Sequence, residues 1–128
     1  MKKTKKKTPA QLKKILWKLF SEWVRRTSGG KCFTCGVQKE WKQLHAGHYI
    51  RSSAGLATYF DEQNVHAQCY ACNIWRDGNS DEYALKLKQT YGEGILEELN
   101  RRKHRVVKDF PFLEKIEEYK EKLSTLQD

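Results

Sequence analysis

Residues 32–73 read CFTCGVQKEWKQLHAGHYIRSSAGLATYFDEQNVHAQCYACN, and this stretch decides the fold. Two Cys-x-x-Cys pairs, Cys32 with Cys35 and Cys69 with Cys72, bracket a segment that holds three of the chain's four histidines. Four thiolates in two such pairs suit tetrahedral zinc in a closed structural site. Disulfides or free thiols are the alternatives. Because 33 residues between the pairs exceed usual zinc-ribbon spacing, we expect zinc to clamp the base of an inserted element.

Composition limits the size of the core. With 128 residues, of which 38% are hydrophobic and 32% charged, one domain with modest flanking elements is expected, and a metal would supplement its small core. No run of about 18 apolar residues is present, and no apolar stretch of signal-peptide type follows the basic N-terminus. We therefore expect a cytoplasmic protein without membrane association, in a reducing compartment where thiols bind metal.

Positive charge is concentrated at the N-terminus. The net charge is +9, and residues 1–31 contain eleven Lys/Arg and one acidic residue. Residues 1–8 are expected to form a disordered basic arm. Such an arm favours a polyanion such as DNA, whereas a solvated solubility tail is the alternative. Nucleic-acid contacts are assigned to the cations of the helix that follows, namely Lys13, Lys14, Lys18, Arg25 and Arg26.

Capping and apolar spacing predict helices at both ends of the chain. Residues 9–30 are expected to form a basic amphipathic helix, with Thr8 as N-cap, Pro9 at the first position and Gln11 completing a capping box. Further predicted elements are a strand within 41–50, a loop at 51–60, an extended piece at 61–68, a helix from Cys72 to about Gly78, a helix capped by Ser80 that ends near Gly92, and a helix at 95–102.

The C-terminal helices, residues 93–128, end in a segment with heptad spacing. Apolar residues recur there at alternating four- and three-residue steps, as Phe112, Ile116, Tyr119, Leu123 and Leu126. This spacing is typical of a coiled coil. It fits either docking onto the chain's own core or self-association into a homodimer.

The histidines between the cysteine pairs suggest phosphodiester chemistry. Hydrolysis needs a base near neutral pH, and histidine has an ordinary pKa of about 6.5. It also needs a divalent cation to offset charge on the phosphate. The segment contains side chains that can act as the base or bind the cation, namely His45, His48, Asn64, His66 and Asn73.

Residues 32–79 resemble the HNH (ββα-metal, His-Me finger) nucleases. The motifs CFTCG, LHAGHYI, DEQN and CYACN follow that family's order. The strings HAGHYIR, FDEQNVHAQC, ACN and RDGNSDEYALKL look closer still to the phage NinG (Rap) recombination nucleases. The resemblance covers most of residues 32–92. It implies an α+β fold, with a zinc-stapled ββα-metal core at 31–92 between N- and C-terminal helices.

The resemblance assigns roles position by position. His48 matches the general base, and Asn64 matches the central Asn that ties down a loop. Asn73 matches a catalytic-metal ligand. Because Asn offers a neutral oxygen, Mg²⁺ or Mn²⁺ suits it better than zinc, which leaves the zinc to the cysteines.

One position departs from the family pattern. Gly47 stands where common members carry an acidic or histidine metal ligand. His45 points to the same side of a strand as residue 47 and is the expected substitute, with Asp77 as a rival. The opposite assignment, with His45 as base and His48 as ligand, also fits the spacing.

Other residues carry weaker assignments. His66 either contacts the phosphate or metal in the site or makes a structural hydrogen bond. Arg51 and Arg76 either clamp phosphate or are solvated. His104 is expected to be an exposed residue at a helix end.

We therefore expect a metal-dependent DNA endonuclease (a hydrolase) that leaves 5′-phosphate and 3′-hydroxyl ends. The NinG resemblance implies a DNA recombination role on branched DNA, such as Holliday junctions or D-loops, and action in the host cytoplasm if the chain is bacteriophage-encoded. The alternatives are a nicking or homing-type HNH nuclease on ordinary duplex, and a non-catalytic zinc-stabilised DNA-binding module.

Overall fold

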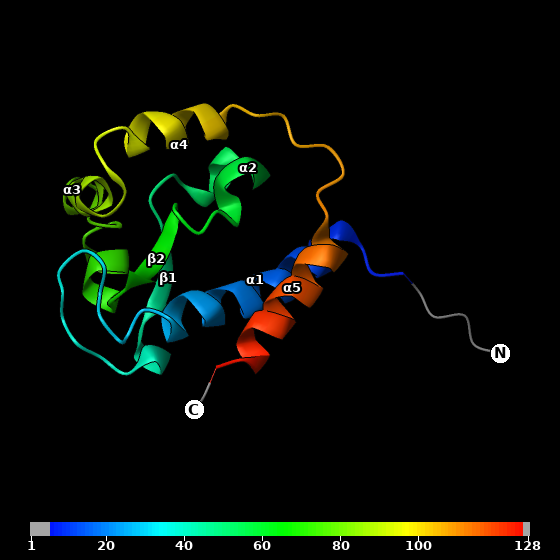
Figure 1. Cartoon of the computed structure of the whole chain (residues 1–128), viewed down its shortest axis with the longest axis horizontal. Helices are drawn as coiled ribbons and strands as arrows, with labels where there is room; N and C mark the ends of the chain where they lie inside the picture. The colour runs from blue at the N-terminus through cyan, green and yellow to red at the C-terminus, as the bar shows by residue number, and fades with distance from the viewer. Residues whose placement is uncertain (1–5, 127–128) are drawn as a thin grey trace.

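The computed structural model describes residues 6–126 as helices arranged around a small two-stranded sheet (Figure 1). In chain order the elements are α1 (Pro9–Arg26), the turn η1 (Trp41–Gln43), β1 (His45–His48), the turn η2 (Ser52–Ala54), α2 (Leu56–Tyr59), β2 (Val65–Gln68), the turn η3 (Ala71–Trp75), α3 (Ser80–Tyr91), α4 (Ile95–Lys103) and α5 (Phe112–Ser124). The predicted α+β class is confirmed. Residues 1–5 of the expected basic arm lie outside the described residues. Among residues 6–126, no helix is both long and apolar enough to cross a membrane.

Helix α1 begins where its capping motif predicts. The Thr8 hydroxyl accepts a hydrogen bond from the backbone N–H of Gln11 (3.2 Å), and the Gln11 side-chain oxygen accepts one from the Thr8 N–H (2.8 Å). The helix ends at Arg26, slightly before the predicted stop at Gly29 and Gly30. These glycines have φ angles of +71° and +78°, which a residue with a side chain rarely adopts.

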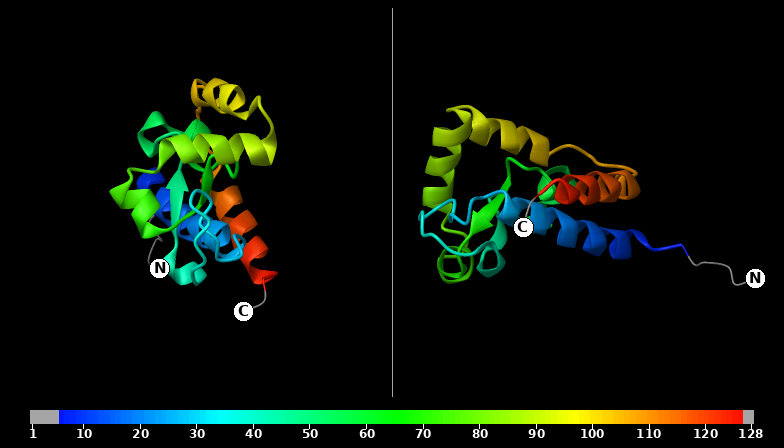
Figure 2. Two further views of the ribbon diagram at one scale, coloured as in Figure 1. Left: turned by 90° about the vertical axis from the view of Figure 1, so that its left-hand side faces the viewer. Right: turned by 60° about the horizontal axis from the view of Figure 1, so that its bottom comes forward.

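Helices α1 and α5 lie side by side and share the largest hydrophobic cluster (Figures 1 and 2). Phe20 of α1 is fully buried, and its ring centroid lies 5.2 Å from that of Tyr119 in α5. Phe112 and Ile116 are buried in the same cluster. The heptad face of α5 therefore docks onto the chain's own core, which confirms that alternative. A homodimer would have to use another surface and stays a prediction.

The sheet pairs β1 with β2 in antiparallel register, with His45 opposite Gln68 and Gly47 opposite His66. The strand predicted within 41–50 is shorter than expected, because residues 41–43 form the helical turn η1. The segment 51–60, expected to be loop, contains η2 and α2. Each strand therefore contains only four residues, and these are the residues that pair.

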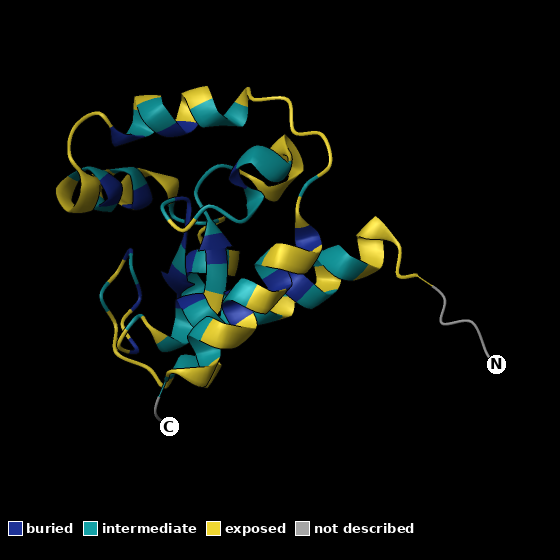
Figure 3. Cartoon of the chain, turned by 45° about the vertical axis from the view of Figure 1, so that its right-hand side comes forward, coloured by how far each residue is buried: buried dark blue, intermediate teal, exposed yellow. Residues whose placement is uncertain are grey.

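Two of the three hydrophobic clusters include residues of this sheet. Val65 of β2 packs in the α1–α5 cluster, and Ala67 of β2 packs beside the cysteines. The third cluster, centred on Tyr83 and Leu99, joins α3 to α4. Figure 3 shows the strands enclosed by these elements. The side chains of a two-stranded sheet, which would be marginal alone, are thereby held in place.

The chain turns sharply after β2. The predicted helix from Cys72 to Gly78 is limited to the turn η3, which ends at Trp75. Asp77, Gly78 and Asn79 all have positive φ angles, of 47°, 86° and 51°, so a right-handed helix cannot continue through them. Helix α3 then begins at Ser80, and Asn79 is its N-cap. The prediction of Ser80 as the cap was therefore wrong by one residue.

Candidate active site beside a four-cysteine cluster

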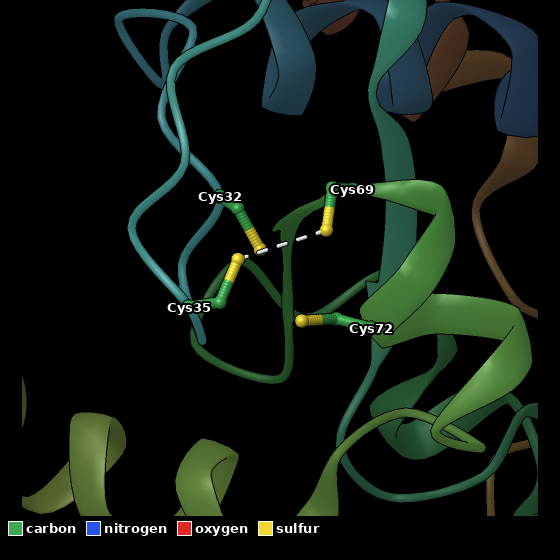
Figure 4. Close-up of side chains that lie close together, drawn as sticks. All are labelled: Cys32, Cys35, Cys69 and Cys72. Carbon is green, nitrogen blue, oxygen red and sulfur yellow. Dashed lines mark hydrogen bonds between the residues drawn. The ribbon is translucent and has the colours of Figure 1, made fainter.

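The four cysteines converge on one point. Their sulfur atoms all lie within 4.8 Å of one another, and none is in a disulfide (Figure 4). Cys35 Sγ and Cys69 Sγ are 3.7 Å apart, close to the roughly 3.8 Å that a tetrahedron with Zn–S bonds of about 2.3 Å requires. The cluster predicted from the two Cys-x-x-Cys pairs is consistent with a structural zinc site.

Hydrogen-bond donors favour the thiolate form of two of the four cysteines, Cys32 and Cys72, whereas burial raises the pKa of the other two thiols. Burial raises the pKa of Cys32, but hydrogen bonds from backbone N–H groups and the Thr34 hydroxyl outweigh it and lower the pKa to about 6. The side chains of Asn79 and Arg76 donate to Cys72 Sγ at 3.5 and 3.7 Å. Such outer contacts orient metal ligands and stabilise their charged form. Arg76 was predicted to contact phosphate, but in the structure its guanidinium donates to Cys72 Sγ of the cysteine cluster.

His48 lies at the end of β1 with one ring nitrogen engaged. Its Nε2 lies 2.9 Å from the backbone carbonyl oxygen of Tyr59. A carbonyl can only accept, so Nε2 carries the proton and Nδ1 of the neutral ring is free to accept one. The ring stacks on Trp17 of α1, with centroids 5.1 Å apart and planes 15° apart. Burial lowers the pKa of His48, the Tyr59 contact opposes this, and the charge of Lys13 lowers it further.

The buried Asn64 ties down the loop that carries Tyr59. Its Oδ1 accepts from the Ile50 N–H (2.7 Å), and its Nδ2 donates to the carbonyls of Ile50 (3.1 Å) and Thr58 (3.0 Å). Thr58 immediately precedes the residue whose carbonyl holds His48. The amide of Asn64 therefore fixes the backbone on which the orientation of His48 depends.

His48 and Asn73 line one cavity of about 390 Å³. Asn73 comes from η3, which starts directly after β2, and its backbone N–H donates to the Cys69 carbonyl (2.9 Å). The four-cysteine cluster thus anchors the turn that carries Asn73. Arg51 and Asp77 line the same cavity, with 84% and 94% of their side chains exposed and a charge contact of 3.8 Å. Both residues were predicted to lie near the site, and both do. Asp77 was expected one helical turn after Asn73, but the turn η3 ends at Trp75, so Asp77 lies beyond its end.

The structure does not bring His45 to this cavity. His45 is exposed on β1, and its ring lies 5.7 Å from that of Tyr70 beside the cysteine cluster. His45 is therefore not among the residues that line the cavity with His48 and Asn73, and its role as a metal ligand stays a prediction. The side chain of Gln68 fills the space beside Gly47.

His66 also lies away from the cavity. The Tyr83 hydroxyl donates to the Gly47 carbonyl (2.7 Å), so it accepts from His66 Nδ1 (3.1 Å). This leaves His66 Nε2 to accept from the Tyr91 hydroxyl (2.7 Å). The ring stacks on Phe33 with centroids 3.9 Å apart. Burial lowers the pKa of His66 to about 4. Of the two alternatives predicted for His66, this geometry favours the structural hydrogen bond.

Comparison with known families identifies the chain. The family model described as Bacteriophage Lambda NinG protein matches residues 1–128. The chain belongs to the NinG family. The NinG resemblance seen in the motifs of residues 32–92 is thus confirmed over the whole length.

Curated NinG relatives come from several phages. Protein ninG of Salmonella phage P22 is 33% identical over 99 residues, covering 76% of this chain and 48% of that protein. Protein ninG of Escherichia phage 933W is 28% identical over 113 residues, covering 77% and 56%. Protein ninG of Escherichia phage lambda is 34% identical over 76 residues, covering 58% and 37%. The chain therefore spans about half the length of the curated relatives it matches. No solved structure matches it.

The basic residues assigned to nucleic acid in this NinG-family chain differ in their surroundings. The Lys13 ammonium lies 4.2 Å from the ring centroid of Tyr59, next to His48. Arg26 pairs with Glu22 (3.2 Å), and Arg25 donates to the Ser21 carbonyl (3.1 Å). Lys14 and Lys18 are exposed on α1. Lys13 is therefore the cation of α1 that stands beside the candidate site.

Gln68 was not among the site residues predicted from the sequence. Its side chain is fully buried and reaches the space beside Gly47. The alternation of β2 places it on one strand face with Asn64 and His66, but only the pairing of His45 with Gln68 brings it to Gly47.

Proposed function

We propose that this protein is a metal-dependent DNA endonuclease of the HNH, ββα-metal type. The observation that carries the proposal is that a neutral His48, with Nδ1 free to accept a proton, shares a cavity with the side chain of Asn73. Two short antiparallel strands followed by a helical turn supply these two residues, in the order that the family pattern implies. The four-cysteine cluster holds the turn η3, because Cys72 lies in this turn and the Cys69 carbonyl accepts from the Asn73 N–H.

The oxygen atoms at the cavity fit a hard divalent cation such as Mg²⁺ or Mn²⁺. Asn73 would hold it, since its Oδ1 lies beside an unpartnered buried oxygen of Gln68. The exposed carboxylate of Asp77 lines the same cavity. When bound, the cation would offset charge on the phosphate and on the departing oxygen. Zinc would stay on the cysteines, because thiolates are the softer ligands.

In the proposed reaction, His48 Nδ1 takes a proton from water while its Nε2–H stays hydrogen-bonded to the Tyr59 carbonyl. The resulting hydroxide oxygen forms a bond to phosphorus, and the bond from phosphorus to the 3′ oxygen breaks. The 3′ oxygen keeps the electron pair and gains a proton from solvent, which gives a 3′-hydroxyl and a 5′-phosphate. Because burial lowers the pKa of His48, the ring is neutral and ready to act at physiological pH.

Charge and exposed aromatic rings support DNA as substrate. Residues 1–31 carry eleven Lys/Arg and one acid, which favours phosphate contacts. On the turn that carries Asn73, Trp75 is 78% exposed and Ile74 is 49% exposed, with Tyr70 close by. Exposed aromatic side chains next to cations stack on unpaired bases. We therefore propose branched DNA, such as a Holliday junction or D-loop, rather than uniform duplex.

The unpaired thiols fit a reducing compartment. We place the activity in the cytoplasm, that of the host cell if the chain is phage-encoded.

A cleavage panel tests the proposal. The zinc-loaded protein with Mg²⁺ or Mn²⁺ is incubated with four-way junction, D-loop and linear duplex of matched sequence. Cutting of the branched forms in preference to the duplex is expected. Equal cutting of all forms would favour a general or nicking nuclease, and no cutting of any form would leave a zinc-stabilised DNA-binding module.

A further inference from the structure

One buried oxygen has no partner. Of the buried side-chain nitrogen and oxygen atoms in residues 6–126, only Gln68 Oε1 lacks a hydrogen bond. An unsatisfied buried acceptor costs about 1–3 kcal/mol. In folded proteins, a buried oxygen without a protein donor is often one that binds an ordered water or an ion.

Rotation of the Gln68 amide cannot relieve this cost. Its Nε2 donates to the Gly78 carbonyl at 2.8 Å and to the Thr34 hydroxyl at 3.2 Å. Because the Gly78 carbonyl only accepts, the nitrogen must face it, and Oε1 is held on the opposite side. There it occupies the place where a Cβ at position 47 would stand.

A second oxygen borders the same point. Asn73 Oδ1 lies 2.9 Å from the Cβ position that Gly47 leaves vacant. Two carbonyl-type oxygens from neighbouring elements, Gln68 Oε1 of β2 and Asn73 Oδ1 of η3, therefore both lie near the Cβ position of Gly47. Oxygens placed in this way suit a hard cation.

We propose that Gln68 is a ligand of the catalytic divalent cation, together with Asn73, in place of a side chain at position 47. The inference rests on the cation of the proposed nuclease site. Gly47 is required because any larger residue would expel the Gln68 oxygen. The glycine at position 47 thus makes room for the unpartnered oxygen of Gln68. Since both donors are neutral, binding without DNA should be weak, and phosphate oxygens should complete the site.

Paramagnetic broadening by Mn²⁺ tests the assignment without any cleavage. In ¹H–¹⁵N spectra of the zinc-loaded full chain, the backbone amide of Gly47 and the side-chain amides of Gln68 and Asn73 should broaden first. In Gln68→Met, which keeps the side-chain length but has no oxygen, at least about tenfold more Mn²⁺ should be needed to broaden Gly47. A loss of that size is typical even when only an outer partner of a metal ligand is removed.

Two further variants separate ligation from packing. Thr34→Val removes a hydrogen-bond partner of Gln68 Nε2 but leaves Oε1, so its Mn²⁺ titration should match that of the wild type. Gln68→Ala should bind weakly, and adding Gly47→Asp to it should restore binding, because the carboxylate then enters the vacated space. Bound zinc and the melting temperature of each variant show that it is folded.

The outcomes are distinct from those of the nuclease proposal. A Gln68→Met titration within twofold of the wild type overturns the assignment, even if the wild type cuts DNA. Failure of Gly47→Asp to rescue Gln68→Ala also overturns it, since Gln68 would then only brace Asn73. If the wild type cuts no DNA yet loses Mn²⁺ through Gln68→Met, the ion site stands and the nuclease proposal fails.

Discussion

His48 Nε2 lies 2.9 Å from the backbone carbonyl oxygen of Tyr59. This contact fixes the ring tautomer, because the carbonyl has no proton to give, and it leaves Nδ1 to act as a base. Neighbours on both sides hold the ring, Trp17 by stacking and Tyr59 by its backbone. The backbone carbonyl of Tyr59 therefore leaves His48 with one defined proton-accepting atom, Nδ1.

The pH dependence of cleavage should report His48. The neutral ring is the active form, and burial and Lys13 lower the pKa of His48 from 6.5. The rate should therefore rise with pH, reach half its maximum below pH 6.5 and stay constant through neutrality. Lys13→Met removes a charge that disfavours the imidazolium, so its profile should shift to higher pH. An inflection above pH 7 in the wild type would contradict this environment for His48.

Asn64→Ala should destabilise the fold by about 2–4 kcal/mol, because the Ile50 N–H and two carbonyls lose their partner inside the protein. Urea denaturation measures this loss. Asn100, exposed on α4, provides the control, and Asn100→Ala should change stability by less than about 0.5 kcal/mol. If the two substitutions changed the free energy of unfolding equally, Asn64 would not hold the loop as inferred.

Metal analysis should find one zinc per chain. Removal by a strong chelator, or by Cys72→Ser, should abolish cooperative thermal unfolding, because binding to a four-cysteine site contributes about 10–16 kcal/mol that folding depends on. Re-addition of Zn²⁺ should restore the transition in the chelated protein, whereas Mg²⁺ should not. An unchanged melting curve after the metal is removed would show that the cluster is dispensable.

Trp75→Ala should weaken binding of a four-way junction about 5- to 150-fold, the effect of losing one stacked base at about 1–3 kcal/mol. Binding of linear duplex should change little, and Trp75→Phe should retain most of the affinity. Leu113, 68% exposed on α5, gives a control in Leu113→Ala. Electrophoretic mobility shifts on both DNAs check the prediction. Equal losses on both would argue against stacking on unpaired bases.

Local sequence patterns predicted the parts of the fold that local physics controls. The capping box of Thr8 and Gln11 and the cysteine pairs are short-range motifs, and both appear as expected. The helix after Cys72 was predicted too long, because Asp77 and Asn79 adopt left-handed conformations that most residues avoid. The Asn79 contact with Cys72 Sγ belongs to the tertiary structure, so no local pattern reveals it.

The composition of the candidate site depended in the same way on long-range pairing. His48, Asn73, Arg51 and Asp77 do line one cavity, as the motif order suggested. The sequence did not predict that His45 would lie outside this cavity, because strand alternation gives the side of a residue but not its depth. The register of His45 with Gln68 decides which of them reaches Gly47, and it is set by pairing between distant segments.

The central claim is that His48 is the base of a DNA-cutting site, and one comparison tests it most directly. His48→Ala is measured beside His104→Ala, a control at an exposed histidine after α4, with four-way junction DNA and Mg²⁺. His48→Ala should lower the single-turnover cleavage rate at least about 100-fold while junction binding persists, and His104→Ala should cut like the wild type. Undiminished cleavage by a folded His48→Ala protein would contradict the assignment.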